Sequence, residues 1–177
     1  MLVHVKYLAY LYLTMYDLCM NDNARLQKPL DDFSPEFGRE VLRCCGSFNL
    51  RKAARSVTQL FDDILQPTGL RSTQVVLLVV LAVEHELSLT RLARELVLSP
   101  STLSRNLQPL ERDGLIETYS AGKRGRFVRL TPQGRGALIN AVPYWRRAQE
   151  KFTGLIGAQA WEELTQRLAA TLAATRT

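Results

Sequence analysis

The sequence predicts a mainly α-helical fold with one small β-hairpin. Apolar residues recur at three- and four-residue spacings over most of the chain from residue 35 onward, as expected for helices that bury one face. The period changes between residues 115 and 131, where "LIETYS" and "RFVRLT" show the alternation typical of strands. The glycine-containing basic segment "AGKRG" joins these two stretches and predicts the turn of a hairpin.

Composition limits the class of protein. A chain of 177 residues can form one domain or two small lobes that share a core. Its 23 basic and 17 acidic residues give a formal net charge of +6, which suits a polyanionic partner without specifying a fold. The sequence contains no Ser-His-Asp set, no metal-ligand spacing and no phosphate-cradling glycine loop. We therefore expect neither an enzyme nor a bound metal or other cofactor.

Residues 1–34 are expected to form an N-terminal extension or linker that is partly disordered. The first twenty residues are apolar, but they lack a small-x-small cleavage site and are too interrupted to span a bilayer. Three interpretations stay open: an extension from an upstream start site, a helix that packs on a partner subunit, and a targeting segment. We expect no membrane partner.

The helices before the hairpin are bounded by capping signals. The motif "SPE" at residue 34 predicts a helix from residue 35 to about Gln66, which Gly46-Ser47 could divide. The segment "QPTGLRST" ends it, and Ser72 or Thr73 is expected to cap "QVVLLVVLAVEHE". That run is apolar nearly all round, so we expect a buried helix. A shorter helix, "LSLTRLAREL", follows.

The segment "SPSTLSRNLQPLERDGL", residues 99–115, predicts the second helix of a helix-turn-helix pair. Ser99 can cap it, Pro100 suits its first position, and leucines at 103, 107 and 110 share one face that should be buried. Short hydroxyls allow close approach to a major groove, and an arginine can reach a guanine edge. The polar residues left on the opposite face are Ser101, Thr102, Ser104, Arg105 and Gln108. The alternative is an amphipathic surface helix with ordinary polar residues.

Pro109 is expected to bend this helix. It removes one helical hydrogen bond and crowds the carbonyl of Arg105, about two turns past the N-terminal end. The turns that would enter a groove should therefore stay regular. After the hairpin, Thr131-Pro132 predicts a long helix to about Leu155, with an interruption possible at Pro143, and a last amphipathic helix ends the chain.

Two short helices followed by a hairpin with a basic tip predict a winged helix-turn-helix. The stretch "LTRLARELVLSPSTLSRNLQPLERDGLIE" with "GKRGRFVRLTPQG" resembles the MarR family of bacterial transcription regulators. The resemblance covers about residues 36–176 and is strongest over 87–136. It implies an obligate homodimer on a pseudo-palindromic operator of double-stranded DNA, released by a small aromatic acid or an oxidant.

The resemblance assigns the parts of the chain. Residues 67–136 would form the winged helix-turn-helix DNA-binding domain, and residues 35–66 with 137–177 an all-helical dimerisation region. Two positions depart from the family pattern. Gly122 stands where an Asp commonly braces the arginine that corresponds to Arg124. Ser47 stands where the peroxide-sensing branch carries its reactive cysteine, immediately before Phe48.

The charge distribution agrees with a DNA-binding surface. Residues 99–136 hold seven basic and three acidic residues, so this segment supplies +4 of the chain's +6. A solvated basic face would give the same count, but clustering on the recognition helix and hairpin favours phosphate contact. The predicted DNA-binding residues are Ser99, Ser101, Thr102, Ser104, Arg105, Gln108, Lys123, Arg124 and Arg126.

Effector and redox residues are also predicted. The resemblance places an effector pocket between the dimerisation helices and the winged helix, where Phe48, Arg51, Phe61, Tyr144 and Trp145 could contribute. Each aromatic could instead be plain core or dimer interface. Cys44 and Cys45 could sense thiol oxidation or be small residues packed at a helix start. Three cysteines with an adjacent pair suit a reducing cytoplasm.

The sequence therefore predicts a cytoplasmic, sequence-specific DNA-binding transcription regulator, in the simplest case a repressor. The alternative from another class is a winged helix that serves protein–protein contact without specific DNA binding. A basic hairpin and a recognition helix without acidic residues at its contact end favour the first. A gel shift on the protein's own upstream DNA separates the two.

Overall fold

The computed structural model describes residues 34–175. The predicted extension of residues 1–34 therefore lies outside the described residues, apart from Ser34. The chain divides into two compact units, the first ending at Ser56 and the second beginning at Val57. No single described helix is long and apolar enough to cross a membrane. Gly46–Thr68 and Ser72–Glu84 reach that length and composition only together, as a bent pair.

The described part of the first unit consists of α2 (Pro35–Cys44) and the first half of α3 (Gly46–Leu65). Ser34 caps α2 as predicted, because its hydroxyl accepts the N–H of Phe37 at 3.2 Å. The break between the helices falls at Cys45, one residue before the predicted position. The carbonyl of Cys45 accepts the N–H of Asn49 at 3.0 Å and begins the next helix.

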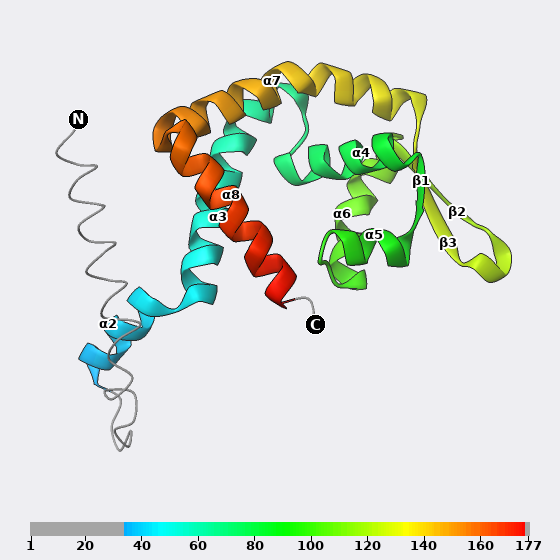
Figure 1. The fold of residues 1–177 in the computed structure, drawn as a ribbon. Helices are drawn as coiled ribbons and strands as arrows, with labels where there is room; N and C mark the ends of the chain where they lie inside the picture. Colours follow the sequence, from blue (N-terminus) through cyan, green and yellow to red (C-terminus); the bar gives the residue numbers. More distant parts are fainter. Residues whose placement is uncertain (1–33, 176–177) are drawn as a thin grey trace. The chain divides into compact units, whose positions relative to one another are not determined.

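The second unit continues α3 from Val57 and contains the remaining elements (Figure 1). In chain order these are η2 (Gln66–Thr68), α4 (Ser72–Glu84), β1 (Glu86–Ser88), α5 (Leu89–Glu95), α6 (Pro100–Arg112), β2 (Ile116–Ser120), η3 (Gly122–Arg124), β3 (Arg126–Leu130), α7 (Pro132–Ile156) and α8 (Ala158–Thr175). This order confirms the predicted fold class, a mainly helical chain with a winged helix-turn-helix.

One hydrophobic cluster joins α4, α5, α6 and the strands. Its members include Leu77, Leu78, Leu81, Leu92, Leu103, Leu107, Leu110, Ile116 and Val128, with Leu138 and Ala141 from α7. The three predicted leucines of α6 are thus buried. The expectation that α4 is buried all round is only half right, because Val76, Val79 and Val83 form an exposed stripe on it.

The start of α4 also differs from the prediction. Arg71, and not Ser72 or Thr73, is the N-cap residue. The side chain of Gln74 accepts the N–H of Arg71 at 2.8 Å, and Asp62 of α3 accepts the N–H of Ser72 at 2.7 Å. The N–H groups of Arg71 and Ser72 are therefore satisfied by the side chains of Gln74 and Asp62, and not by the side chain of the N-cap residue.

The sheet has three antiparallel strands in the order β1-β3-β2. The β2–β3 hairpin was predicted from the sequence, but β1 was not; it is three residues long and follows α4 almost directly. Leu87 of β1 lies opposite Val128 of β3, and both are buried. The strand thus anchors the base of the hairpin to the core.

The turn between α5 and α6 contains an unusual backbone conformation. Val97 has a φ of +53°, in the left-handed region that β-branched residues rarely adopt. The N–H of Leu98 donates to the carbonyl of Ala93 at 2.8 Å across this turn, which ends α5 and starts the approach to α6. The two helices of the helix-turn-helix are therefore joined through a strained residue.

The start of α7 is attached to the turn between α6 and β2, a contact that we call the α7 junction. Thr131 caps α7 by accepting the N–H of Gly134 at 2.9 Å, and its hydroxyl donates to the carbonyl of Gly114 at 2.7 Å. The N–H of Thr131 donates to the carbonyl of Leu115 at 3.1 Å. The amide of Gln133 donates to the carbonyl of Asp113 at 3.1 Å.

Helix α7 continues without interruption from Pro132 to Ile156, although Pro143 lies inside it. It packs on α4 in its first half and contacts α8 near its end (Figure 1). Phe152 connects three helices there, with ring centroids 6.4 Å from Phe61 of α3 and 5.3 Å from Trp161 of α8.

Candidate nucleic-acid interface

The N-terminal end of α6 is built from hydroxyl groups. Ser99 is the N-cap, as predicted, and its Oγ accepts the N–H of Thr102 at 3.2 Å. The same oxygen lies 3.0 Å from the hydroxyl of Ser101 and 2.8 Å from that of Thr102. The three side chains are exposed, so this first turn presents a fixed cluster of short polar groups to solvent.

The predicted polar face of α6 is exposed, but it divides into two parts. Ser104 and Gln108 lie on the flank that faces α5 and the hairpin, since both line the cavity described below. Ser101, Thr102 and Arg105 do not line it and are exposed to solvent. We call these three residues the outer strip of α6. An arginine among short side chains is suited to reach base edges in a major groove.

Pro109 is accommodated inside α6, which runs as one helix from Pro100 to Arg112. The carbonyl of Pro109 itself accepts the N–H of Asp113 at 3.0 Å, so helical bonding resumes after it. The proline lies more than two turns from Ser99. The regular first turns that the sequence predicted are therefore present, and the predicted bend remains a prediction.

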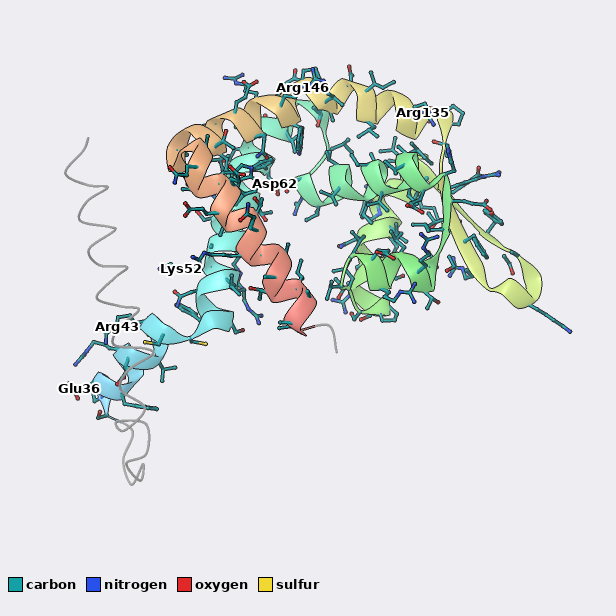
Figure 2. The ribbon with its side chains drawn as sticks, viewed as in Figure 1. Glu36, Arg43, Lys52, Asp62, Arg135 and Arg146 are labelled. Atoms are coloured by element: carbon teal, nitrogen blue, oxygen red, sulfur yellow. The ribbon has the colours of Figure 1, made fainter. Side chains whose placement is uncertain are left out.

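The hairpin carries the other predicted cations. Lys123 is exposed in η3, and Arg126 is exposed at the start of β3. The side chain of Arg124 lies outside the described residues, so its predicted contact stays a prediction. Figure 2 shows Arg135 beside the base of the hairpin, at the beginning of α7. The basic residues therefore extend from the tip of the hairpin to its base.

Arg129 of the hairpin interacts with Glu117 and Tyr119 on the solvent face of the sheet. Its Nε donates to Glu117 at 2.6 Å, and its guanidinium lies 5.3 Å from the centre of the Tyr119 ring. The hydrogen bond and charge of Glu117 raise the pKa of Arg129 above its ordinary value. The hydroxyl of Tyr119 donates to Glu86 of β1. These side-chain contacts on the solvent face connect β3 to β2 and β2 to β1.

A cavity of about 310 Å³ separates α5 and α6 from the hairpin. Leu89, Ala93, Leu103 and Leu107 contribute apolar walls, and Thr90, Pro100, Ser104, Gln108, Glu111, Thr118 and Arg126 complete the lining. Across it, the hydroxyl of Thr118 donates to Glu111 of α6 at 2.5 Å, and within the hairpin the same hydroxyl accepts from Arg126 at 3.2 Å. Glu111 and Thr118 were not predicted as site residues, because only the packing of α6 against the hairpin brings them together.

The predicted effector residues fall in both units. Phe48 and Arg51 are exposed on α3 in the first unit. In the second unit, Phe61 and Tyr144 pack against the same hydrophobic cluster, while Trp145 is largely exposed on α7. Neither the cavity beside α6 nor an open hollow around Asp62 and Arg71 is lined by any of the five. Their role in binding an effector stays a prediction.

The predicted redox residues lie where α2 gives way to α3. Cys44 is the last residue of α2, and Cys45 follows it with a free thiol. Both are partly buried. The sulfur of Cys45 accepts the N–H of Phe48 at 3.5 Å, which places it at the N-terminal end of α3. This position fits the interpretation of a small residue at a helix start and leaves the sensing interpretation open.

Comparison with known proteins gives the family. Residues 68–126 match the model of the MarR family. The chain is 31% identical over 121 residues to the biofilm growth-associated repressor of Xylella fastidiosa (strain 9a5c), covering 68% of this chain and 93% of that protein. The chain belongs to the MarR family of transcriptional regulators.

Other MarR-type relatives agree. The transcriptional regulator HosA of Escherichia coli is 36% identical over 72 residues, which are 40% of this chain and 53% of HosA. The structure of the M. tuberculosis transcriptional regulator MosR is similar with a TM-score of 0.65 at 33% identity, over 73% of this chain and 94% of that one. A structure of MosR in complex with DNA has a TM-score of 0.64 at 33% identity, over 75% and 99%.

One of the two positions that depart from the MarR family pattern, Gly122, lies in the hairpin. Gly122, which stands where the family resemblance expects a bracing Asp, begins η3 with a φ of +62°. Glycine carries no side chain that could hold Arg124. Among the described side chains of the hairpin, Arg126 is hydrogen-bonded to Thr118 and Arg129 to Glu117.

Proposed function

We propose that this MarR-family protein binds a specific DNA operator and represses transcription from it. The observation that carries the proposal is the arrangement of α6. Its leucines are buried in the core while the outer strip of Ser101, Thr102 and Arg105 faces solvent. A helix held in this way can enter a major groove without unfolding any part of the domain. The DNA complex of MosR supports this use of the fold.

The hairpin would supply contacts to the DNA backbone. Lys123, Arg124 and Arg126 stand on or beside its tip, and Arg135 lies at its base. Contacts from a hairpin to phosphates fix the position of a protein on the duplex, while base contacts from the recognition helix select the sequence. Residues 67–136 would thus be the DNA-binding domain. The other predicted DNA-binding residues of α6 lie next to the outer strip. Ser99 is at the N-terminal end of the helix, and Ser104 and Gln108 are on the flank that lines the cavity.

The protein would act as a homodimer. Helix α8 exposes Leu164, Leu168 and Leu172, which recur every four residues and so form one apolar stripe. Leu155 and Ile156 at the end of α7 are exposed as well. A contiguous apolar surface of this kind is typical of a subunit interface. Residues 35–66 and 137–177 would form the dimerisation region, and two related α6 helices would read a pseudo-palindromic site.

A small molecule or thiol oxidation would release the DNA. The candidate residues for a small aromatic effector are Phe48, Arg51, Phe61, Tyr144 and Trp145, and Cys44 and Cys45 are the candidates for oxidation. A regulator of this kind needs no catalytic residues and no cofactor of its own. It would act in the cytoplasm, where the DNA is.

Selection of bound duplexes from a random library by the full-length protein tests the proposal. We expect an enriched motif with two inverted halves whose centres lie about one helical turn apart, ~10–10.5 base pairs. A gel shift with the protein's own upstream DNA then checks whether that motif occurs there. Failure to enrich any duplex, with the protein folded and dimeric, would support the protein–protein interaction alternative.

A further inference from the structure

We propose that Glu111 and Thr118 are positioning residues that hold Arg126 for contact with the DNA backbone. The proposal rests on the proposed function and adds two residues that touch no base or phosphate themselves. We call the chain Arg126–Thr118–Glu111 the wing relay. It joins the recognition helix to both strands of the hairpin, because the three residues lie on β3, β2 and α6.

The direction of each hydrogen bond in the wing relay is fixed by chemistry. An ionised carboxylate only accepts and a guanidinium only donates. The single hydroxyl proton of Thr118 must therefore point to Glu111, at 2.5 Å, which leaves an oxygen lone pair for Nη2 of Arg126, at 3.2 Å. Polarisation by the carboxylate strengthens the second bond. The remaining N–H groups of Arg126 stay available for a phosphate.

The wing relay matters because a cavity replaces part of the side-chain packing between the hairpin and α6. The base of the hairpin is anchored in the core by Val128 and Ile116. Thr118 lies directly opposite Val128, and the cavity of about 310 Å³ is lined by Thr118 and Arg126 of the hairpin together with residues of α5 and α6. Where a cavity separates side chains, their van der Waals contacts are lost, so the hairpin and α6 constrain each other less there. The side chain of Thr118 bonds to Glu111 of α6 across this space and to Arg126 of β3 on its own side of it.

The other charged pair of the hairpin provides a matched comparison. Glu117 precedes Thr118 in β2, but its side chain lies on the opposite face of the sheet and bonds to Arg129 at 2.6 Å. Glu117 and Glu111 each place one negative charge near the hairpin. Removal of either should favour a polyanion by the same long-range effect. Only removal of Glu111 also breaks the wing relay.

The experiment uses full-length protein and measures affinity for the selected operator and for a scrambled duplex across a salt series. Thr118→Val removes the hydroxyl at nearly constant shape, and Thr118→Ser restores it. We expect Thr118→Val to bind both duplexes about three- to tenfold more weakly, with log K less steep in log salt by up to about one unit per subunit. Thr118→Ser should return both quantities toward the wild-type values.

The carboxylates give a second, independent pair of variants. Glu111→Met should weaken DNA binding although it removes a negative charge, whereas Glu117→Met should strengthen it or leave it unchanged. In an Arg126→Ala background, Thr118→Val should have no further effect, because the group that it positions is gone. Thermal unfolding of each variant shows whether the fold is retained. If Thr118→Val fails to fold, the comparison of Glu111→Met with Glu117→Met still tests the inference.

Three outcomes would overturn the inference. Thr118→Val could bind and respond to salt like the wild type. Glu111→Met could bind more tightly, like Glu117→Met, which would show that only total charge matters. Thr118→Val could weaken binding equally with and without Arg126, which would assign Thr118 a general structural role. A folded wild-type protein that selects no duplex would instead refute the proposed function, and the inference with it.

Discussion

Replacing Gly134 by Ala tests whether the α7 junction stabilises the DNA-binding unit. An added Cβ at this buried position would lie 1.9 Å from the carbonyl oxygen of Leu115 and 2.8 Å from its carbonyl carbon. It would also lie 2.8 Å from Cδ1 of Leu130. Two of these three atoms are backbone, so a side-chain rotation cannot relieve the clash. The start of α7 must move away from the turn between α6 and β2.

That movement stretches the hydrogen bonds of the α7 junction. Thr131 donates to the carbonyls of Gly114 and Leu115, and Gln133 donates to that of Asp113. A net value of about 0.5–1.5 kcal/mol for each bond gives roughly 1.5–4.5 kcal/mol for the three. The higher helix propensity of alanine offsets about 1 kcal/mol. We therefore expect Gly134→Ala to lower the free energy of unfolding by about 0.5–3.5 kcal/mol.

Gly136→Ala is the matched control, two residues later in the same helix. No atom lies within 4 Å of the position that its Cβ would take, so only the helix propensity changes. This variant should gain up to about 1 kcal/mol. At about 2–4 °C per kcal/mol, the two variants should shift Tm in opposite directions. Equal stability of the two, measured by urea and thermal unfolding at one fixed protein concentration, would refute the reasoning.

Four further predictions concern other parts of the molecule. Arg105→Ala should cost about 1–3 kcal/mol on the operator and little on scrambled duplex in fluorescence anisotropy; equal losses on both would make this residue a phosphate contact. Val97→Gly should stabilise the domain by up to about 1 kcal/mol in urea unfolding, because glycine adopts its φ without strain; destabilisation would contradict this. Leu168→Asp should yield monomer in sedimentation experiments, since it places a charge in the proposed dimer interface; an intact dimer would exclude α8 from that interface. A Cys44→Ser/Cys45→Ser variant should stay on DNA when treated with diamide or hydroperoxide, and release like that of the wild type would exclude a sensing role for these two cysteines.

Local signals in the sequence were sufficient for the recognition helix. The cap at Ser99, the proline at position 100 and the leucine spacing all act within one helix, and the structure confirms each of them. The hairpin and the cap at Thr131 were predictable for the same reason. Neighbouring residues determine these features, so a single sequence contains the information.

Features that depend on distant segments could not be predicted in this way. Strand β1 exists because Glu86–Ser88 pairs with β3, some forty residues later, and three residues alone carry too weak a pattern. The close approach of Gly134 to Leu115 and the bond between Glu111 and Thr118 arise only once α6, the hairpin and α7 are packed together. Secondary-structure periodicity shows which face of a helix is buried, but not what lies opposite it.

Because the α7 junction attaches α7 to one end of α6, a rotation of α7 would move the other end of α6 furthest. The junction holds the C-terminal end of α6, whereas the outer strip lies toward the other end of a helix of 13 residues, about 20 Å long. If α6 turned with α7 by about 10° about this fulcrum, its far end would travel about 3 Å, as much as the length of a hydrogen bond. Arg105, in the middle of the helix, would move about half as far, which would strain a base contact, while bonds at the junction itself would hardly change. A small rotation of α7 would therefore displace the exposed side chains near the start of α6 much more than the residues at the junction.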